Sequence, residues 1–256
     1  MDKRIIIYII LVVVIFLTGC KDNVGLSNSN TERDIIIQQL ETKHFKFYSK
    51  DEDIGCLKDL SNALEENYIR ITTDLKTSLN KKADIYIYSD LSTYHKAINQ
   101  PNAQNWEIAS TTYDSNVIKM VNPLNADGFS YSDFMKTIVH EFVHIVEHNI
   151  SGGKYVPRWL DEGIAAYESG LDDGVYQFIS NAKYDNKIPS LKDLDTDAGT
   201  FGNIGGYQFS YSIVEYAVNN YGYDKLTALI KAPSDFEKIF GFSIEDFEEE
   251  WIAQLK

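Results

Sequence analysis

Two histidines and two glutamates are spaced in this chain as hydrolytic chemistry would need them. The segment His140-Glu141-Phe142-Val143-His144 is followed by Glu162, eighteen positions beyond His144. Residues four apart in a helix lie one turn apart on the same face, so the two imidazoles can point at one ion. Two imidazoles and a carboxylate suit Zn²⁺, and three protein ligands leave a fourth position for water. Glu141 would stand beside that water as a base, which predicts hydrolysis.

An amphipathic surface helix could carry the same residues without any metal. The neighbouring side chains argue against that alternative, because apolar residues surround the segment on most sides: Phe134, Ile138, Val139, Phe142, Val143, Ile145 and Val146. A helix this apolar is expected to be buried, and buried ionisable groups need partners. The sequence therefore favours a metal site.

The third ligand must come from outside the two-histidine pair, and Glu147, His148 and Glu162 are the candidates. His148 lies roughly 12 Å along the helix axis from the first histidine at ~1.5 Å per residue, too far to share an ion. Glu147 is expected to point away from the face of the two histidines, half a turn off. A loop at 151–157 containing Gly-Gly and Pro can reverse the chain, and a second helix would then bring Glu162 back against the first.

These residues resemble a known family. HEFVH with a downstream WLDEGIAAY is similar to the gluzincin class of zinc metallopeptidases. It is most similar to the small bacterial peptidases described as peptidase MA-like, whose second motif has the form W-L-x-E-G-x-A. The resemblance extends over about residues 40–256, weakly at the flanks. It implies that His140, His144 and Glu162 are the ligands of one Zn²⁺ per chain and that Glu141 is the base.

Two departures from the family pattern bear on the substrate. Seventeen residues separate His144 from Glu162, one fewer than in the aminopeptidases of the class, and the chain lacks a Gly-x-Met-Glu-Asn sequence. Those aminopeptidases use that sequence to hold a substrate's amino terminus. The resemblance therefore implies an endopeptidase whose partner is a peptide or protein substrate.

An oxyanion formed during such a reaction usually needs a donor besides the metal. Tyr207 is placed where the resembling family often carries a tyrosine, and the nearby Gly202, Gly205 and Gly206 give a mobile approach. Tyr211, one turn further, is the alternative donor. Both can equally be ordinary aromatic residues in a chain with 17 Tyr.

A protein of another class would also fit these motifs. The alternative is a catalytically idle zincin-fold lipoprotein that acts as a binding or scaffold module. A binding module has no need of a base beside the metal. Because Glu141 is intact, the sequence favours the zinc metallopeptidase.

The amino-terminal residues are expected to be a targeting segment. Lys3 and Arg4 precede an apolar run, Ile5 to Leu17, that is normal for a signal-peptide core and short for a membrane span. It ends in Leu-Thr-Gly-Cys20, which resembles the bacterial lipobox and implies lipidation of Cys20 after removal of residues 1–19. Residues 20–35 are expected to form the lipidated tether. The predicted location is the bacterial cell membrane, facing outside, with an uncleaved anchor as the alternative.

Charge and cysteine usage limit the other partners. The formal net charge is -14, and removal of Asp2, Lys3 and Arg4 with the signal peptide would make it -15. Such acidity argues against nucleic acid as a partner. Cys56 has no partner once Cys20 is lipidated, so a small core residue is expected there. The sequence does not indicate an oligomeric state.

The predicted fold is α+β. Strands are expected at 44–48 and 84–88 and in a hairpin of 106–113 with 117–121, helices at 57–75 and 91–98, and mostly helix from Phe134 to a last one at 244–255. A sheet lobe of residues 36–125 and a helical lobe of 126–256 would form one zinc metallopeptidase domain, 36–256, with a thermolysin-like active site between them.

Two further segments have competing interpretations. The strand at 116–122 corresponds to the edge strand that pairs with substrate in gluzincin-like folds, or it is a plain sheet strand. Asp193, Asp195 and Asp197 alternate as in a calcium-binding loop. The glycine there comes one position late and Ile204 replaces the final glutamate, so a solvated loop is expected and calcium is not.

Overall fold

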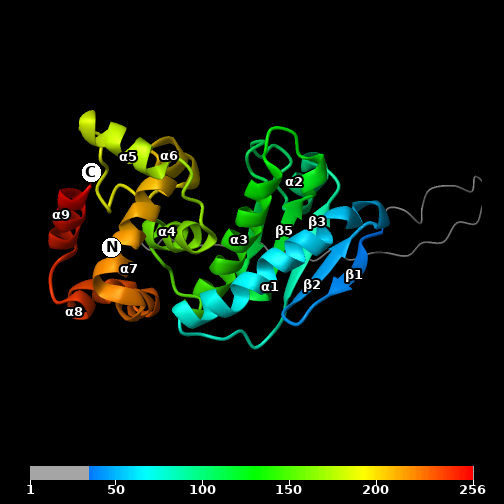
Figure 1. Ribbon diagram of the computed structural model, residues 1–256, viewed down its shortest axis with the longest axis horizontal. Coiled ribbons are helices and arrows are strands. Elements are labelled where there is room, and N and C mark those ends of the chain that lie inside the picture. The colour runs from blue at the N-terminus through cyan, green and yellow to red at the C-terminus, as the bar shows by residue number, and fades with distance from the viewer. Residues whose placement is uncertain (1–34, 256) are drawn as a thin grey trace, which may run out of the picture. The chain divides into compact units, whose positions relative to one another are not determined.

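The order of strands and helices agrees with the α+β prediction. A computed structural model describes residues 35–255, which form a mixed five-stranded sheet followed by a mostly helical region (Figure 1). The strands are β1 (Ile37–Glu41), β2 (Phe45–Ser49), β3 (Ala83–Tyr88), β4 (Ala109–Thr112) and β5 (Val117–Val121). The helices are α1 (Leu57–Asp74), α2 (Leu91–Ala97), α3 (Tyr131–Ser151), α4 (Arg158–Ser169), α5 (Val175–Tyr184), α6 (Ala198–Asn203), α7 (Gly206–Lys231), α8 (Phe236–Phe240) and α9 (Ile244–Gln254). The predicted signal peptide, Cys20 and the tether up to residue 34 lie outside the described residues.

The strand order is β1-β2-β3-β5-β4, with parallel pairing of β3 to β2 and β5 and antiparallel pairing at both edges. The predicted hairpin is confirmed, although its first strand begins only at Ala109. Of the two interpretations of 116–122, the substrate-pairing edge strand is wrong and the plain sheet strand is confirmed. Ile118 of β5 pairs with Ile85 on one side and Thr111 on the other, so β4 is the edge. Buried alternate apolar residues suit β5 to an inner position, whereas the Ser and Thr side chains of β4 suit an edge.

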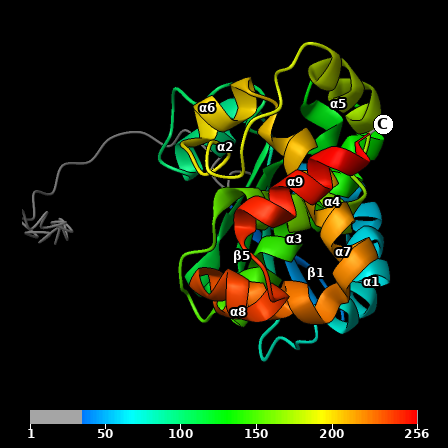
Figure 2. The ribbon, with the colours of Figure 1, turned by 90° about the vertical axis from the view of Figure 1, so that its left-hand side faces the viewer.

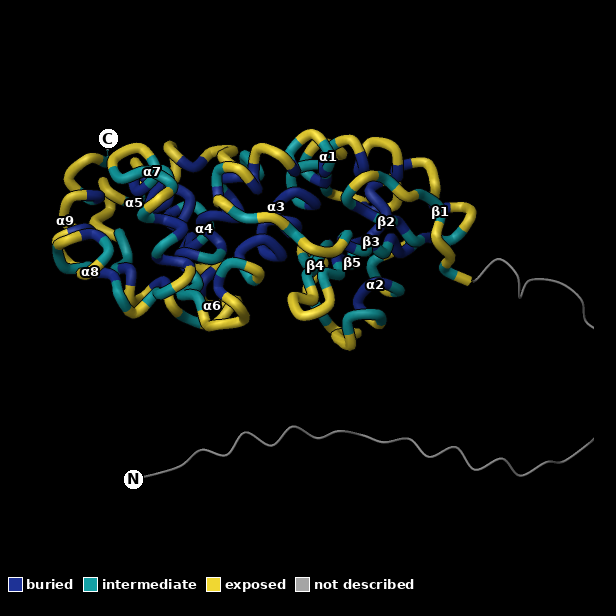
Figure 3. Tube along the Cα trace, turned by 90° about the horizontal axis from the view of Figure 1, so that it is seen from below, coloured by how far each residue is buried: buried dark blue, intermediate teal, exposed yellow. Residues whose placement is uncertain are grey.

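Helices cover both faces of the sheet (Figure 3). On one face, the Phe45 ring of β2 lies 5.2 Å from Phe142 of α3 and 6.0 Å from Tyr68 of α1, between ring centroids. On the other face, the Lys119 ammonium donates a hydrogen bond to the Ala97 carbonyl at the end of α2. Because Phe142 lies inside the HEFVH segment, the apolar side of α3 is fixed to the sheet and its opposite side faces the helical region.

Local signals set the ends of α3 and reverse the chain into α4. The Ser130 hydroxyl accepts a hydrogen bond from the Asp133 N–H at the start of α3, and Gly152 ends the helix with a φ of 63°. Gly153 continues the turn at a φ of 76°, and α4 begins directly after Pro157. The predicted helix–loop–helix arrangement is therefore confirmed.

A close helix contact fixes α4 in place. A Cβ atom on Gly163 would lie 2.6 Å from the Ser210 carbonyl oxygen of α7, so only glycine allows this approach. The α7 helix is broken at Gly222, whose φ and ψ are 77° and 170°, and α9 lies against α7 through the Trp251 and Phe209 rings (Figure 2). None of the described helices is both long and apolar enough to cross a membrane.

Candidate metal centre

The two helices bring three of the predicted site residues together. His140 and His144 lie one turn apart in α3, with their Nε2 atoms 3.1 Å apart. Oε2 of Glu162 in α4 lies 3.3 Å from Nε2 of His140 and 3.7 Å from Nε2 of His144. All three side chains are almost fully buried. Two imidazole nitrogens and one carboxylate oxygen thus converge on one point.

This donor set fits a metal ion. One ligand atom from each of His140, His144 and Glu162 lies within 4.8 Å of the other two. Two Nε2 atoms that face each other at 3.1 Å can hold only one proton between them, whereas a cation would satisfy both lone pairs. The chemistry of the set, two nitrogens and one oxygen, is the one that Zn²⁺ takes in catalytic sites.

Charge interactions within the cluster favour the ionised form of Glu162. Burial raises the pKa of its carboxyl, but the hydrogen bond from His140 and the positive charge of His144 outweigh burial and hold the pKa below its ordinary value. The other carboxylate oxygen, Oε1, lies 3.4 Å from a guanidinium nitrogen of Arg158, one turn earlier in α4. Arg158 was not predicted as a site residue, although its i,i+4 spacing to Glu162 could have indicated the pair.

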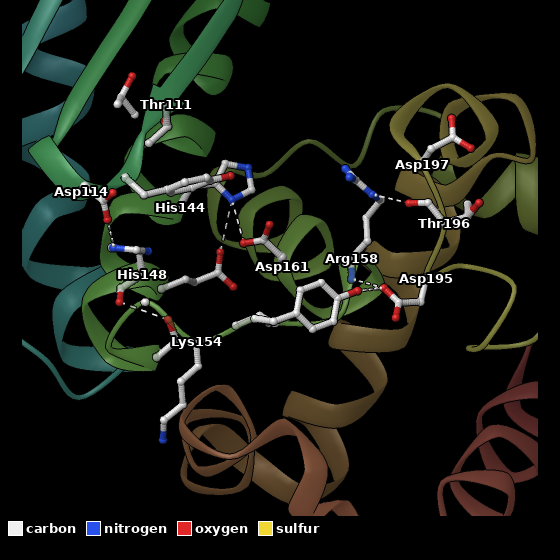
Figure 4. Close-up of a pocket in the computed structure, with 17 residues that line it drawn as sticks. Thr111, Asp114, His144, His148, Lys154, Arg158, Asp161, Asp195, Thr196 and Asp197 are labelled. Atoms are coloured by element: carbon white, nitrogen blue, oxygen red, sulfur yellow. Dashed lines mark hydrogen bonds and ion pairs between the residues drawn. The ribbon is translucent and has the colours of Figure 1, made fainter. Parts of the chain in front are cut away.

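Two carboxylates face the far nitrogen of His144. Its Nδ1 lies 3.1 Å from Oδ1 of Asp161 and 3.4 Å from Oε2 of Glu147 (Figure 4). The prediction that Glu147 points away from the histidines is wrong, because three residues along a helix bring side chains to neighbouring positions. Burial alone would lower the pKa of His144, but Asp161 and then Glu147 raise it well above its ordinary value. Sequence reasoning did not identify Asp161, which directly precedes the expected ligand.

His148 lies apart from the three converging ligand atoms. Its ring stacks on Tyr113 at 5.5 Å between centroids, and its Nε2 lies 3.3 Å from Oδ1 of Asp114. The Tyr113 ring also meets the edge of the His144 ring at 6.1 Å. A tyrosine ring beside the histidines on this side was not foreseen from the sequence.

Glu141, the predicted base, is held by the edge strand. The Thr111 hydroxyl of β4 lies 2.7 Å from Oε2 of Glu141 and 2.9 Å from its backbone oxygen. Thr111 stands thirty residues before Glu141, and no local pattern indicated that contact. A neutral hydroxyl donor therefore orients this carboxylate beside the two histidines.

The two candidate tyrosines occupy different positions. Tyr207 lines the same depression as His140 and Glu141, and burial followed by the charge of Glu162 raises the pKa of its hydroxyl above 10.0. Tyr211 packs against Tyr167, with 5.5 Å between ring centroids, and lines neither depression beside the centre. Of the two, Tyr207 is the one that the fold brings to the cluster.

Depressions open on both sides of the centre. One of about 400 Å³ meets His140, Glu141 and the start of β4 and is partly apolar, with Trp106 and Phe129 in its wall. The other, a cavity of about 940 Å³, meets His144 and the end of β4. Strand β4 thus passes from one depression to the other.

The predicted solvated loop contributes to the larger cavity. Asp195 accepts hydrogen bonds from the Tyr155 hydroxyl and the Arg158 N–H, and Asp197 caps α6. Asp193 instead accepts from Ser190. The three carboxylates therefore bind separate local donors.

One protein family matches the part of the chain that carries the cluster. The sequence profile of the Peptidase MA superfamily matches residues 63–256, which include α3, α4 and all three converging ligands. A search of curated proteins finds no matching relative. Because the match spans most of the sequence, the chain belongs to the Peptidase MA superfamily.

Proposed function

We propose that the protein is a zinc-dependent metallopeptidase that cleaves within peptide chains. The observation that carries this proposal is the convergence of His140 Nε2, His144 Nε2 and Glu162 Oε2 beside the oriented carboxylate of Glu141. Membership of a peptidase superfamily supports a peptide or protein as the substrate. A protein that only binds a partner would not need the fourth of these groups, the Glu141 carboxylate.

The proposed roles follow from each residue's contacts. His140, His144 and Glu162 would hold the zinc ion, which supplies Lewis acidity and lowers the pKa of a water molecule. Glu141 takes the proton of the attacking water, and the hydrogen bond from the Thr111 hydroxyl restrains its carboxylate. Tyr207 donates a hydrogen bond from its hydroxyl to the oxygen that becomes negative, and its raised pKa keeps the proton on the hydroxyl.

The substrate is proposed to lie along β4. Ile108 accepts a hydrogen bond from Val121 of β5, so the antiparallel alternation leaves the backbone groups of Ala109 and Thr111 facing the open edge. An extended peptide can pair with these groups without a demand on its sequence. A peptide on this edge would reach a depression on each side of the metal centre, which favours internal cleavage over removal of a terminal residue.

Two substitutions test the proposal. We expect Glu141→Gln to keep zinc and to lose roughly 10²–10⁴-fold in hydrolysis of casein and of a peptide library, because the base is gone. His144→Ala should lose both zinc and hydrolysis. Zinc content is measured by mass spectrometry on the purified protein. Zinc binding without cleavage in the unsubstituted protein would instead support the alternative of a binding or scaffold module.

The cellular location is a separate proposal that rests on the sequence. We propose that Cys20 is lipidated and that the domain is held on the outer side of the bacterial membrane. Cys20→Ala should abolish incorporation of labelled palmitate and move the protein out of the membrane fraction. Continued labelling of the variant would exclude this site.

A further inference from the structure

The larger cavity beside the metal centre is lined by acidic groups. Five carboxylates from four parts of the chain face it: Asp114, Glu147, Asp161, Asp195 and Asp197. Among the described residues, none of the five forms an ion pair with lysine or arginine. Asp114, Glu147 and Asp161 each lie within 3.4 Å of a histidine nitrogen. Asp195 and Asp197 accept only hydrogen bonds, so no basic side chain of the described residues balances their charge.

The two basic side chains of the cavity wall are engaged elsewhere. Arg158 directs one guanidinium nitrogen to Glu162 at 3.4 Å and donates its Nε–H to the Thr196 carbonyl at 2.7 Å. The Lys154 ammonium donates to the Lys231 carbonyl at 3.2 Å, and its side chain points away from the labelled carboxylates (Figure 4). Neither cation is placed to neutralise the exposed acids on the loop after α5.

One carboxylate of the cavity wall is buried, which distinguishes the cavity from a group of surface acids. Glu147 lines the cavity and is 1% exposed, and neither of its oxygens has a hydrogen-bond partner among the described residues. Its nearest cationic neighbour is His144, whose Nδ1 lies closer to Asp161. A buried carboxyl group without a hydrogen-bond partner is costly, and a hydrogen-bond donor such as an ammonium or guanidinium group entering the cavity would reduce that cost.

The cavity lies where a bound peptide would reach it. Thr111 and Thr112 at the end of β4 and the ligand His144 share its wall. A peptide that pairs with β4 across the metal centre therefore places a side chain or terminus next to the carboxylates. We infer that this cavity binds a positively charged group of the substrate, a Lys or Arg side chain, close to the scissile bond. This inference rests on the proposed function and adds the class of substrate.

The amino terminus of a peptide is positively charged, as a Lys side chain is. The test substrates must therefore distinguish binding of the terminus from binding of the side chain. The test compares peptides that differ only by Lys, Gln or Glu at one position near the scissile bond, each with a free or an acetylated amino terminus. We expect kcat/KM for the acetylated Lys peptide to exceed that for the Gln peptide by roughly tenfold, since a few partly exposed ion pairs contribute. The ratio should fall at 0.5 M salt. A preference that acetylation removes would assign the cavity to the terminus and overturn the side-chain assignment.

Charge-neutralising variants identify the cavity as the source of the preference. Asp114→Asn combined with Asp195→Asn should reduce the Lys/Gln ratio to about threefold or less. In Asp195→Asn the amide oxygen can still accept from Tyr155 and Arg158, so the loop keeps its bonds. Asp193→Asn is the matched control, because this exposed acid of the same loop does not line the cavity. An unchanged ratio in the double variant, or an equal loss in the control, would refute the inference.

A binding measurement separates this inference from the proposed function. The zinc-loaded Glu141→Gln protein is titrated with the same fluorescent peptides, and Lys peptides should bind roughly tenfold more tightly than Gln peptides. Charge-selective binding without any hydrolysis by the unsubstituted protein would sink the peptidase proposal and keep the cavity assignment. Equal binding of all peptides would sink the assignment, whatever the hydrolysis assay gives.

Discussion

Asp161 is the residue whose removal tests the arrangement around the metal most directly. Its Oδ1 lies 3.1 Å from Nδ1 of His144 and fixes the proton on that nitrogen. The other nitrogen, Nε2, then presents its lone pair to His140 and Glu162. We expect Asp161→Ala to weaken zinc binding without removing any ligand, because the imidazole loses its orientation.

The expected loss of zinc affinity in Asp161→Ala depends on a second carboxylate, that of Glu147. Loss of such a partner typically weakens metal binding 10–100-fold, or about 1.4–2.8 kcal/mol. Glu147 lies 3.4 Å from the same nitrogen and can take over the hydrogen bond. Asp161→Ala alone should therefore weaken zinc binding about tenfold. Asp161→Ala combined with Glu147→Ala, which removes both acceptors, should approach 100-fold, more than the two single effects together.

Zinc affinity is measured by competition with a chelator, and the absorption spectrum of the Co²⁺ form reports ligand geometry. Asp161→Asn keeps an acceptor oxygen and should recover part of the affinity. Asp173→Ala, which removes an exposed carboxylate paired with Lys136, controls for the loss of charge. If Asp161→Ala keeps full zinc affinity and the same Co²⁺ spectrum, while the metal-free protein melts at a lower temperature, the residue is structural and the reasoning fails.

Three further outcomes are expected elsewhere. Thr111→Val should lower kcat by about tenfold or more with zinc content unchanged, because Glu141 loses its 2.7 Å donor; an unchanged kcat would exclude that role. Gly163→Ala should cost about 1–3 kcal/mol in a denaturant titration, since its Cβ would meet the Ser210 carbonyl at 2.6 Å. Burial raises the pKa of Glu168 above 4.5, so its contribution to stability is complete below pH 4.5 and is lost as pH rises through the raised pKa. Glu168→Gln should flatten that part of the stability profile, and an unaltered slope would contradict this.

The sequence was sufficient where the signal is local and periodic. Four-residue spacing placed His140 and His144 on one face, and Gly152 with Pro157 predicted the reversal that brings Glu162 to them. The strands and helices up to residue 121 were also predicted within a few residues, except β1. These features follow from short-range geometry, which a single sequence records directly.

The contacts around these residues were not predictable in the same way. Thr111 reaches Glu141 across thirty residues, through the antiparallel partner of an inner strand. The choice between an edge strand and a plain strand at 116–122 stayed open for the same reason, because strand order depends on long-range pairing and not on the pattern within one strand. Glu147 was misplaced by treating its direction as half a turn from the histidines, whereas its carboxylate returns to Nδ1 of His144.

Three carboxylates at the candidate metal centre have different partners, and these partners indicate different roles. Glu162 is held by His140 and Arg158, and Asp161 is held by His144, so positive or imidazole groups tie both of them. Glu141 receives its hydrogen bond from a neutral hydroxyl and forms no ion pair among the described residues. Its remaining lone pairs are available to accept a proton, whereas the other two are committed to neighbours. The assignment of the base therefore rests on these contacts as well as on its place in the motif.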